Sequence, residues 1–210
     1  MKLIGMLDSP YVRRVAVSLQ LLGLRFEHQS LSVFRQFDAI RAINPLVKAP
    51  TLVCDDGTVL MDSTLILQYA QALARPRSLE PQEPGALMRD LRLTGLAMAA
   101  CEKAVQIIYE HGLRPAEKRH APWLERVGGQ LAAACGALEQ ELADGPQPAG
   151  QEALTQGWLS AAVAWRFVQA NVPDAVPAAA HPRLAAFGDK AEAWPAFAAA
   201  PHGDGTVRAA

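Results

Sequence analysis

The feature that most constrains this chain is a change in hydrophobic periodicity at residues 75–85, "RPRSLEPQEPG". Before this segment, short apolar runs of strand type alternate with helical patterns, whereas beyond it apolar residues recur only at helical spacings. The segment holds three prolines and no apolar period, which is typical of an exposed linker. A chain of 210 residues is long enough for two small domains. The pattern therefore predicts an α/β domain followed by an all-helical domain.

The first 74 residues predict the element order β-α-β-α-β-β-α. The first two strands are joined by a helix from Pro10 to Leu22, which implies a parallel pair. Two later apolar runs flank Asp55-Asp56-Gly57, and Asp-Gly between such runs is a strong β-hairpin signal. The expected strands are residues 2–6, 25–31, 51–54 and 58–61; the later helices cover 34–43 and begin at 62–63; the first helix has Val12, Val15, Ala16, Leu19 and Leu22 on one face.

The region beyond the linker predicts long helices packed as a bundle. Apolar residues alternate between spacings of four and three through residues 87–108, and again through 124–142. Further helices are expected at about 155–170 and 182–199, and the remainder has no apolar pattern. The expected buried stripes are Leu87, Leu91, Thr94, Met98, Cys101, Val105 and Ile108 in the first helix, and Leu124, Val127, Leu131, Ala134, Leu138 and Leu142 in the second.

One helix start in this region lacks a complete local cap. Thr155 stands where a helix begins, but the third residue after it is Trp158. A capping box needs an acidic or amide side chain there to bond back to the cap residue. The sequence therefore predicts a helix start that its own first turn does not fully stabilise.

Composition excludes several classes of function. The net charge of −1 predicts neither a nucleic-acid partner nor an anionic membrane surface. No apolar run is long enough to span a bilayer, and the first ten residues do not resemble a signal peptide. Cys54, Cys101 and Cys135 are widely spaced and odd in number, which favours free thiols in a reducing cytoplasm. The five histidines show no metal-ligand spacing, so no metal is expected.

The stretch "DSPYVRRV" places Ser9 immediately before Pro10 and an apolar helix. Serine followed by proline at the first helical position is what an ordinary helix start looks like. The same hydroxyl would also lie at the positive end of the helix dipole, where it could serve chemistry on an anion. From position alone the capping interpretation is favoured, and the catalytic one stays open.

Three segments together resemble the cytosolic glutathione S-transferase family, in its bacterial form. "SPYVRRVAVSLQLLGL" resembles the family's first helix, "NPLVKAPTLVCDDGTVLMDSTLILQYA" its glutathione-binding segment, and "HPRLAAFGDKAEAWPAF" its last long helix. The resemblance covers about residues 1–200 and implies an α/β thioredoxin-like N-terminal domain with an all-α C-terminal bundle. The expected domains are a glutathione-binding domain at 1–76, a linker at 77–84, a helical domain at 85–200 and a tail at 201–210.

The resemblance implies that Ser9 is the catalytic residue and contacts the glutathione sulfur. A free thiol has a pKa near 8.5, so it is mostly protonated at neutral pH and must ionise to attack an electrophile. A helix N-terminus and a hydroxyl donor both favour the charged sulfur. Tyr11 lies inside the helix and is the weaker candidate for this role.

The remaining glutathione-binding residues also follow from the resemblance. The Ala49–Pro50 bond is cis in the family, and the Ala49 backbone would pair with the cysteinyl part of glutathione; the alternative is an ordinary turn proline. Asp62 would meet the γ-glutamyl ammonium and Ser63 its carboxylate, although both residues also suit a helix N-cap. Lys48 is the leading candidate for the glycine carboxylate, ahead of Arg35 and Gln36.

The expected activity is conjugation of glutathione, as cosubstrate, to small hydrophobic electrophiles, in a homodimer without metal. One alternative is a glutathione-binding or regulatory protein of the same fold without catalysis. A second is a thiol–disulfide or deglutathionylating enzyme, which needs an attacking cysteine at the first helix. Position 9 is serine and the nearest cysteine is Cys54, so this alternative is disfavoured.

Overall fold

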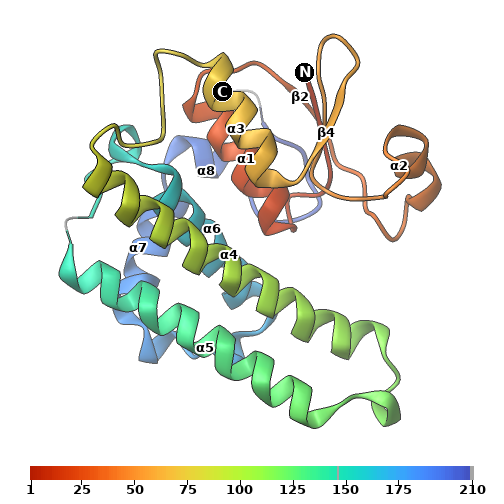
Figure 1. Cartoon of the computed structure of the whole chain (residues 1–210). Coiled ribbons are helices and arrows are strands. Elements are labelled where there is room, and N and C mark those ends of the chain that lie inside the picture. Colours follow the sequence, from red (N-terminus) through yellow and green to blue (C-terminus); the bar gives the residue numbers. More distant parts are fainter. Residues whose placement is uncertain (146, 209–210) are drawn as a thin grey trace. The chain divides into compact units, whose positions relative to one another are not determined.

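The computed structural model describes residues 1–145 and 147–208, which form two compact units (Figure 1). The first unit comprises Met1–Pro81, Gly150–Leu154 and the segment from Glu192 onward. The second comprises Gln82–Ala149 and Thr155–Ala191. The C-terminal segment therefore groups with the N-terminal α/β elements. The expected tail, 201–210, extends to positions 209–210, which lie outside the described residues.

The first unit contains a four-stranded mixed sheet in the order β2-β1-β3-β4. The β1–β2 pair is parallel, and the hairpin adds two antiparallel neighbours, with Leu52 opposite Leu60. This confirms the predicted order β-α-β-α-β-β-α. The elements are β1 (Lys2–Ile4), α1 (Pro10–Leu21), β2 (Glu27–Gln29), α2 (Phe37–Ile43), β3 (Thr51–Val53), β4 (Val59–Met61) and α3 (Ser63–Leu73).

Helices α1 and α3 pack side by side in this unit (Figure 1). The predicted apolar face of α1 is buried along its whole length, as the helical spacing requires. In α3 the buried apolar residues are Ile66, Leu67 and Ala70. Leu65, Tyr69 and Leu73 lie at i, i+4 and i+8 and stay exposed, so α3 carries a second apolar stripe on its surface.

The predicted helix at 182–199 is wrong as a single helix. The structure divides it into α7 (Pro182–Glu192) and α8 (Pro195–Ala199). Trp194 adopts extended backbone angles, φ −74° and ψ 144°. The ring of Pro195 disfavours a helical conformation at the residue before it, so the chain turns between the two helices.

The C-terminal segment is attached to α1 through a buried arginine. Arg13 forms a bidentate ion pair with Glu192, at 2.6 and 2.7 Å, and its Nε donates to the Ala200 carbonyl at 2.8 Å. The guanidinium also lies over the Phe197 ring. Such planar bidentate geometry is the strong form of an ion pair. One side chain of α1 thus contacts the last residue of α7, the middle of α8 and the residue that follows α8.

His28 in β2 makes a second attachment to the same segment. Its Nε2 donates to the Gly5 carbonyl at 2.7 Å, and its Nδ1 accepts from the Val207 amide at 3.1 Å. This arrangement requires the neutral ring, because a protonated Nδ1 cannot accept a hydrogen bond. Burial lowers the pKa of His28 below its ordinary value, and the bond to Gly5 only partly offsets this.

The folded protein should therefore lose stability as the pH falls below about 6.5, where an unfolded histidine begins to bind a proton that folded His28 resists. The single-proton limit on this contribution is about 1.4 kcal/mol per pH unit. We expect His28→Asn to flatten the unfolding free energy between pH 6.5 and 5, measured by urea titration. The exposed His111 offers a matched control, His111→Asn. Equal slopes in the parent and His28→Asn would contradict the prediction.

The second unit is built from four helices, of which α4 packs against both α5 and α6 (Figure 1). The predicted stripe of α5 is confirmed from Val127 to Leu142, where the expected positions are buried, whereas Leu124 is only half-buried. The predicted stripe of α4 is wrong except at Cys101, which is buried. Leu91 is exposed, and the other predicted positions are only half-buried. The elements are α4 (Pro84–Leu113), α5 (Ala121–Asp144), α6 (Gln156–Asn171) and α7, with 3-10 turns at Ala116–Lys118, Pro173–Ala175 and Ala178–Ala180; a further 3-10 turn, Gln151–Ala153, belongs to the first unit.

The true buried face of α4 is rotated relative to the predicted one. It carries Asp90 and a series of small residues, Ala97, Ala100 and Ala104. Small side chains allow two neighbouring helices to approach α4 closely, and Leu93 and Ile107 are buried on the same face. The apolar spacing alone does not reveal this, because alanine carries little weight in the pattern and Asp90 counts against burial.

Asp90 supplies the cap that α6 lacks locally. Thr155 makes no capping bond with its own side chain; its hydroxyl donates instead to Asp90 Oδ1. The same oxygen accepts from the Gly157 amide at 2.9 Å. A Cβ on Gly157 would lie 2.6 Å from Asp90 atoms, so this position needs glycine. An acid of α4 thus does what the missing capping-box residue would have done.

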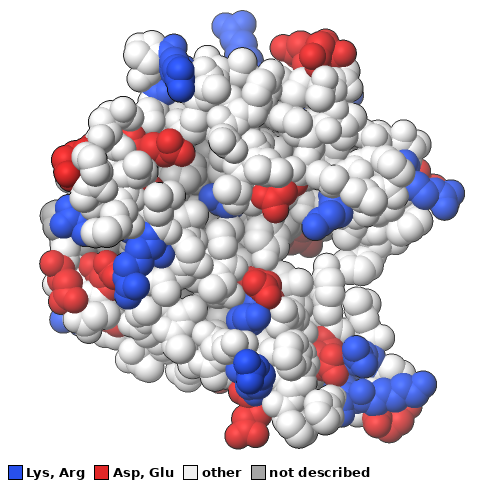
Figure 2. All heavy atoms as spheres, viewed as in Figure 1, with Lys and Arg blue, Asp and Glu red and all other residues white. Residues whose placement is uncertain are grey.

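The surface is mixed in charge. On the face that Figure 2 draws, the basic and acidic side chains alternate and gather into no region of one sign. This distribution matches the net charge of −1. Among the helices of the described residues, none is long and apolar enough to cross a membrane.

Candidate active site

Ser9 is the N-cap of α1. Its backbone is extended, with φ −72° and ψ 123°, and its Oγ accepts from the Val12 amide at 3.4 Å. That distance is long for a hydrogen bond, so the cap is weak. Because the hydroxyl acts only as acceptor in this contact, its own proton remains usable toward another partner. Ser9 is half-buried and lies at the positive end of the helix.

Gly5 brings the Ala49 loop against the first turn of α1. Its φ of +132° is one that side chains rarely allow. A Cβ at this position would lie 2.5 Å from Val12 Cγ2 and 3.0 Å from Ala49 Cβ. The chain therefore passes here without a side chain, and Ala49 packs close to the helix turn that Ser9 caps.

The loop that contains Lys48 and Ala49 is held by a buried polar network. Thr51 Oγ1 donates to the Lys48 carbonyl at 2.6 Å and accepts from Asn44 Nδ2 at 2.9 Å. Asn44 and Thr51 are both buried. The Ala49–Pro50 peptide bond is cis, as the resemblance implied. The sequence interpretation missed Asn44 and Thr51. Asn44 directly precedes Pro45, and this pair is a turn signal that could have drawn attention to Asn44.

Asp62 and Ser63 lie at the start of α3, and their side chains make different contacts. Asp62 is exposed, and its carboxylate caps the helix through the Thr64 and Leu65 amides at 2.8 and 3.4 Å. Ser63 is buried and its Oγ accepts from Arg14 Nη1 at 3.1 Å. The capping interpretation is therefore correct for Asp62. Arg14 was not predicted, because a single arginine inside an apolar helix face gives no spacing signal.

Two residues near these positions have unusual backbone conformations. Val47 has φ 50° and Asp62 has φ 69°, and they are the only non-glycine residues with positive φ in the described part of the chain. Such conformations cost of order 1–3 kcal/mol and cluster at ligand-binding sites. A β-branched residue such as Val47 is especially disfavoured there. Both outliers directly precede residues predicted to bind glutathione.

The candidates for the glycine carboxylate differ in their surroundings. Lys48 is exposed. Arg35 Nη2 lies 3.5 Å from Met6 Sδ, and its charge acts on Asp8, whose pKa is nevertheless raised, chiefly by burial. Gln36 uses its side-chain oxygen to accept from the Ser32 amide at 2.7 Å. Gln36 is therefore engaged locally.

The structure thus brings three of the predicted groups around α1. Ala49 lies beside its first turn through Gly5, and Ser63 is tied to it through Arg14. Ser9 caps its N-terminus. The buried Arg14, in the second turn of α1, thereby connects this helix to the N-terminus of α3. Helix N-termini favour anions, so the arrangement suits a ligand with more than one negative group.

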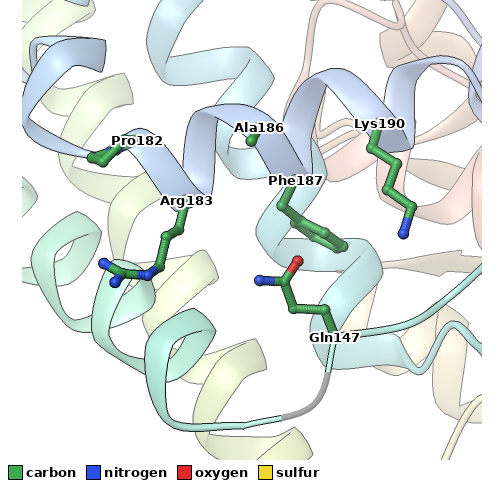
Figure 3. A pocket seen from close by; sticks show the side chains of 6 residues that line it. All are labelled: Gln147, Pro182, Arg183, Ala186, Phe187 and Lys190. Carbon is green, nitrogen blue, oxygen red and sulfur yellow. The ribbon is translucent and has the colours of Figure 1, made fainter.

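A hollow of about 470 Å³ in the second unit has none of these residues in its wall (Figure 3). Its two cations are bound to protein partners: Lys190 Nζ donates to the Pro148 carbonyl at 3.1 Å, and Arg183 pairs with Glu139. No charged group is thereby directed at a ligand. The lining residues are Gln147, Pro182, Arg183, Ala186, Phe187 and Lys190.

Two thiols of the chain, Cys54 and Cys135, have a raised pKa. All three cysteines are buried. Burial raises the pKa of Cys54, and it raises the pKa of Cys135 to about 12. A raised pKa lowers the thiolate fraction on which nucleophilic attack depends. Within residues 1–145 and 147–208, no group of three or more His, Cys, Asp or Glu could hold a metal ion.

Comparison with known proteins finds a matching family model and a similar curated protein. Residues 3–78 match the family model of the glutathione S-transferase N-terminal domain. The chain is 28% identical over 145 residues to YibF, a GST-like protein of Escherichia coli K12, covering 69% of this chain and 71% of YibF.

Two solved structures extend the likeness over nearly the whole chain. A glutathione S-transferase of Methylobacterium radiotolerans, in complex with glutathione sulfonate, is 27% identical with a TM-score of 0.85, covering 100% of this chain and 95% of that one. A glutathione transferase family member of Pseudomonas fluorescens, with bound S-(propanoic acid)-glutathione, is 30% identical with a TM-score of 0.77, covering 95% and 98%. The predicted thioredoxin-like fold class is thereby confirmed, and the chain belongs to the glutathione S-transferase family.

Proposed function

We propose that this protein is a glutathione S-transferase that joins the glutathione thiolate to small hydrophobic electrophiles. Ser9 contacts the sulfur and stabilises its charged form, and the backbone of Ala49 pairs with the cysteinyl part. Ser63 and Asp62 bind the γ-glutamyl group, and Lys48 binds the glycine carboxylate. Glutathione is a cosubstrate here, and no metal takes part.

One observation carries this proposal. Ser9 caps α1, and Arg14 of the same helix donates to Ser63 at the N-terminus of α3, within one unit. Glutathione has a thiol that must become anionic and an α-carboxylate that already is. Two positive helix ends offer one site for each. The relatives of Methylobacterium radiotolerans and Pseudomonas fluorescens with bound glutathione derivatives support the choice of ligand.

The chemistry at the sulfur follows from electrostatics. The helix dipole and a hydrogen bond from Ser9 both stabilise the thiolate relative to the thiol, so the pKa of bound glutathione falls toward neutral pH. The thiolate then attacks an electrophilic carbon, the carbon–sulfur bond forms, and a leaving group such as halide departs with its electron pair. The proton of the thiol goes to solvent.

The surface of α3 supports a homodimer. Leu65, Tyr69 and Leu73 form an exposed apolar stripe, and exposed contiguous apolar surface of this kind marks interaction sites. The stripe is continuous along one side of the helix because its members are four residues apart. Analytical ultracentrifugation of the parent chain tests this assembly.

The function is tested by measuring glutathione affinity and the conjugation of a generic aryl halide side by side. We expect glutathione to bind with a Kd in the micromolar to millimolar range that is usual for enzyme substrates, and turnover to depend on it. Binding without any conjugation would favour a non-catalytic glutathione-binding protein. Absence of binding would refute the proposal. Conjugation that requires one of the three cysteines would instead favour thiol–disulfide chemistry, against which their burial argues.

A further inference from the structure

The segment that follows α8 belongs to the first unit and is bound to the end of strand β2. Residues 201–208 have neither helical nor strand structure, and we call them the C-terminal strap. The Asp204 carbonyl accepts from Ser30 Oγ at 2.7 Å, and the Val207 amide donates to His28 Nδ1 at 3.1 Å. The strap is thus attached both to β2 and to the residue that follows it.

The strap can detach from β2 at a low cost in free energy. Gly203 and Gly205 stand on either side of Asp204, and Gly203 has a φ of +144°. Glycine regains more backbone freedom on release than any other residue. Residues 204–206 are exposed, and segments with little buried surface open at the lowest free energies.

His28 binds the strap in only one protonation state. Because the Val207 amide is a donor, His28 Nδ1 must be the acceptor, and the ring proton lies on Nε2, which donates to the Gly5 carbonyl at 2.7 Å. Protonation adds a second N–H, at Nδ1, which would face the N–H of Val207. The bond from Nε2 to Gly5 needs no change. Protonation of His28 therefore breaks its bond to the strap and preserves its bond to Gly5.

The direction of the pH dependence follows from this geometry. Burial lowers the pKa of His28 below its ordinary value of 6.5, and the bond to Gly5 partly offsets this. The strap is therefore bound at neutral pH and is released as the pH falls through the pKa of folded His28. The other titratable groups on β1, on β2, between β1 and α1, and on the strap are Lys2, Glu27, Asp8, His202, Asp204 and Arg208. Lys2 and Glu27 pair with each other at 3.6 Å.

The bound strap also carries a charge toward the start of α1. Burial chiefly raises the pKa of Asp8, the negative charge of Asp204 acts in the same direction, and Arg35 opposes it. Asp8 directly precedes Ser9. Since the Asp204 backbone is held by Ser30, the place of its carboxylate depends on the attachment of the strap.

We propose that the C-terminal strap is a pH-operated latch. Neutral His28 holds Val207, and protonation of His28 releases the strap from β2 and withdraws Asp204 from Asp8. The fixed point of the latch is Gly5, to which His28 stays bound in both states. Acidification thereby changes the charge beside the N-terminus of α1 while the sheet remains intact.

The first test follows His28 and Val207 together by nuclear magnetic resonance of the full chain, from about pH 8 to about pH 4.5. We expect the imidazole nitrogens of His28 and the amide of Val207 to titrate with one midpoint. Across the same midpoint the Val207 amide should lose its protection against hydrogen exchange, measured relative to its intrinsic rate at each pH. A Val207 amide that stays protected and unshifted while His28 titrates would overturn the proposal.

The second test reverses the coupling. Val207→Pro removes the N–H donor without altering His28, and proline interrupts no helix or strand there. If the strap opposes protonation, its loss should raise the proton affinity of His28 by about 2- to 10-fold, the effect of one ordinary hydrogen bond. Val207→Ala keeps the N–H and is the matched control, with the parental affinity expected. Equal proton affinities in the two variants would contradict the latch.

Two further variants examine each end of the latch. His28→Asn places an amide oxygen near the position of Nδ1 and does not titrate, so the Val207 amide should stay protected down to the lowest pH. Asp204→Asn should lower the pKa of Asp8 in the bound strap, as should Val207→Pro, because both remove the charge of Asp204 from Asp8. An unchanged Asp8 in both variants would refute the link to the start of α1.

His202 is retained in every variant, so its titration is common to all of them. If Val207→Pro fails to fold, His28→Asn still decides, because loss of Val207 protection at low pH in that variant would show that His28 is not the latch. Every measurement is made without glutathione. Failure of the proposed function would therefore leave the latch untouched, and failure of the latch would leave the proposed function untouched.

Discussion

Ser9→Ala should lower kcat/KM for aryl halide conjugation by about 10- to 100-fold, because the variant lacks one hydrogen bond to a charged sulfur. The pKa of bound glutathione should rise by about one to two units, since a shift of one unit corresponds to about 1.4 kcal/mol. Glutathione affinity at low pH, where the sulfur is a thiol, should change little. A pH profile of kcat/KM and the ultraviolet absorbance of the thiolate measure both effects.

The control must separate the hydroxyl from the helix cap, since Ser9 also accepts from the Val12 amide. Alanine at an N-cap costs about 1 kcal/mol of stability, whereas glycine costs only a few tenths. Ser9→Gly therefore removes the hydroxyl while sparing the helix, and Ser9→Thr retains both. We expect the glycine variant to be as slow as the alanine variant and the threonine variant to be faster than either. Parental rates in both Ser9→Ala and Ser9→Gly would mean that the α1 N-terminus alone stabilises the thiolate.

The sequence was sufficient for the parts of this fold that local signals encode. The order of strands and helices in the first unit follows from apolar periods and from Asp-Gly at the hairpin, because both depend on residues close together in the chain. The cap residues Ser9 and Asp62 were identifiable for the same reason. Each is a short-range pattern with one physical meaning.

Long-range polar pairs could not be predicted in this way. Arg14 reaches Ser63 across 49 positions, and Asp90 reaches Gly157 across 67. A lone polar residue on an apolar face interrupts the hydrophobic pattern. The residues near it in the sequence do not indicate which distant residue is its hydrogen-bond partner. The wrong face assigned to α4 has this origin, because Asp90 was placed outside a core that it helps to complete.

In the candidate site, too, the residues with local sequence signals could be predicted and the residues that support them could not. Ser9, Ala49, Asp62 and Ser63 were chosen from a resemblance whose motifs are local. The residues that hold them in place, such as Asn44 and Thr51 under the loop of Lys48, are polar, buried and individually unremarkable in the sequence. Supporting residues are therefore less accessible to sequence reasoning than the residues they support.

Asp90→Ala should lower the free energy of unfolding by about 2–4 kcal/mol. The estimate combines the loss of a helix cap, about 1 kcal/mol, with a buried amide and a hydroxyl that lose a charged partner, at about 1.5–3 kcal/mol. Both groups, the Gly157 amide and the Thr155 hydroxyl, belong to the start of α6, which packs against α4. The effect should appear in urea unfolding and as faster hydrogen exchange in the first turn of α6.

Glu83 provides the comparison, because it caps α4 from an exposed position through the Gly85 and Ala86 amides at 2.8 and 2.7 Å. Glu83→Ala should cost only about 1 kcal/mol, as for an ordinary N-cap. Asp90→Asn should fall between the two, since the amide oxygen can still accept from Gly157 without the charge. If Asp90→Ala were no more damaging than Glu83→Ala, the start of α6 would not depend on α4. The incomplete box at Thr155 would then be stabilised by packing alone, with no acid taking the missing position.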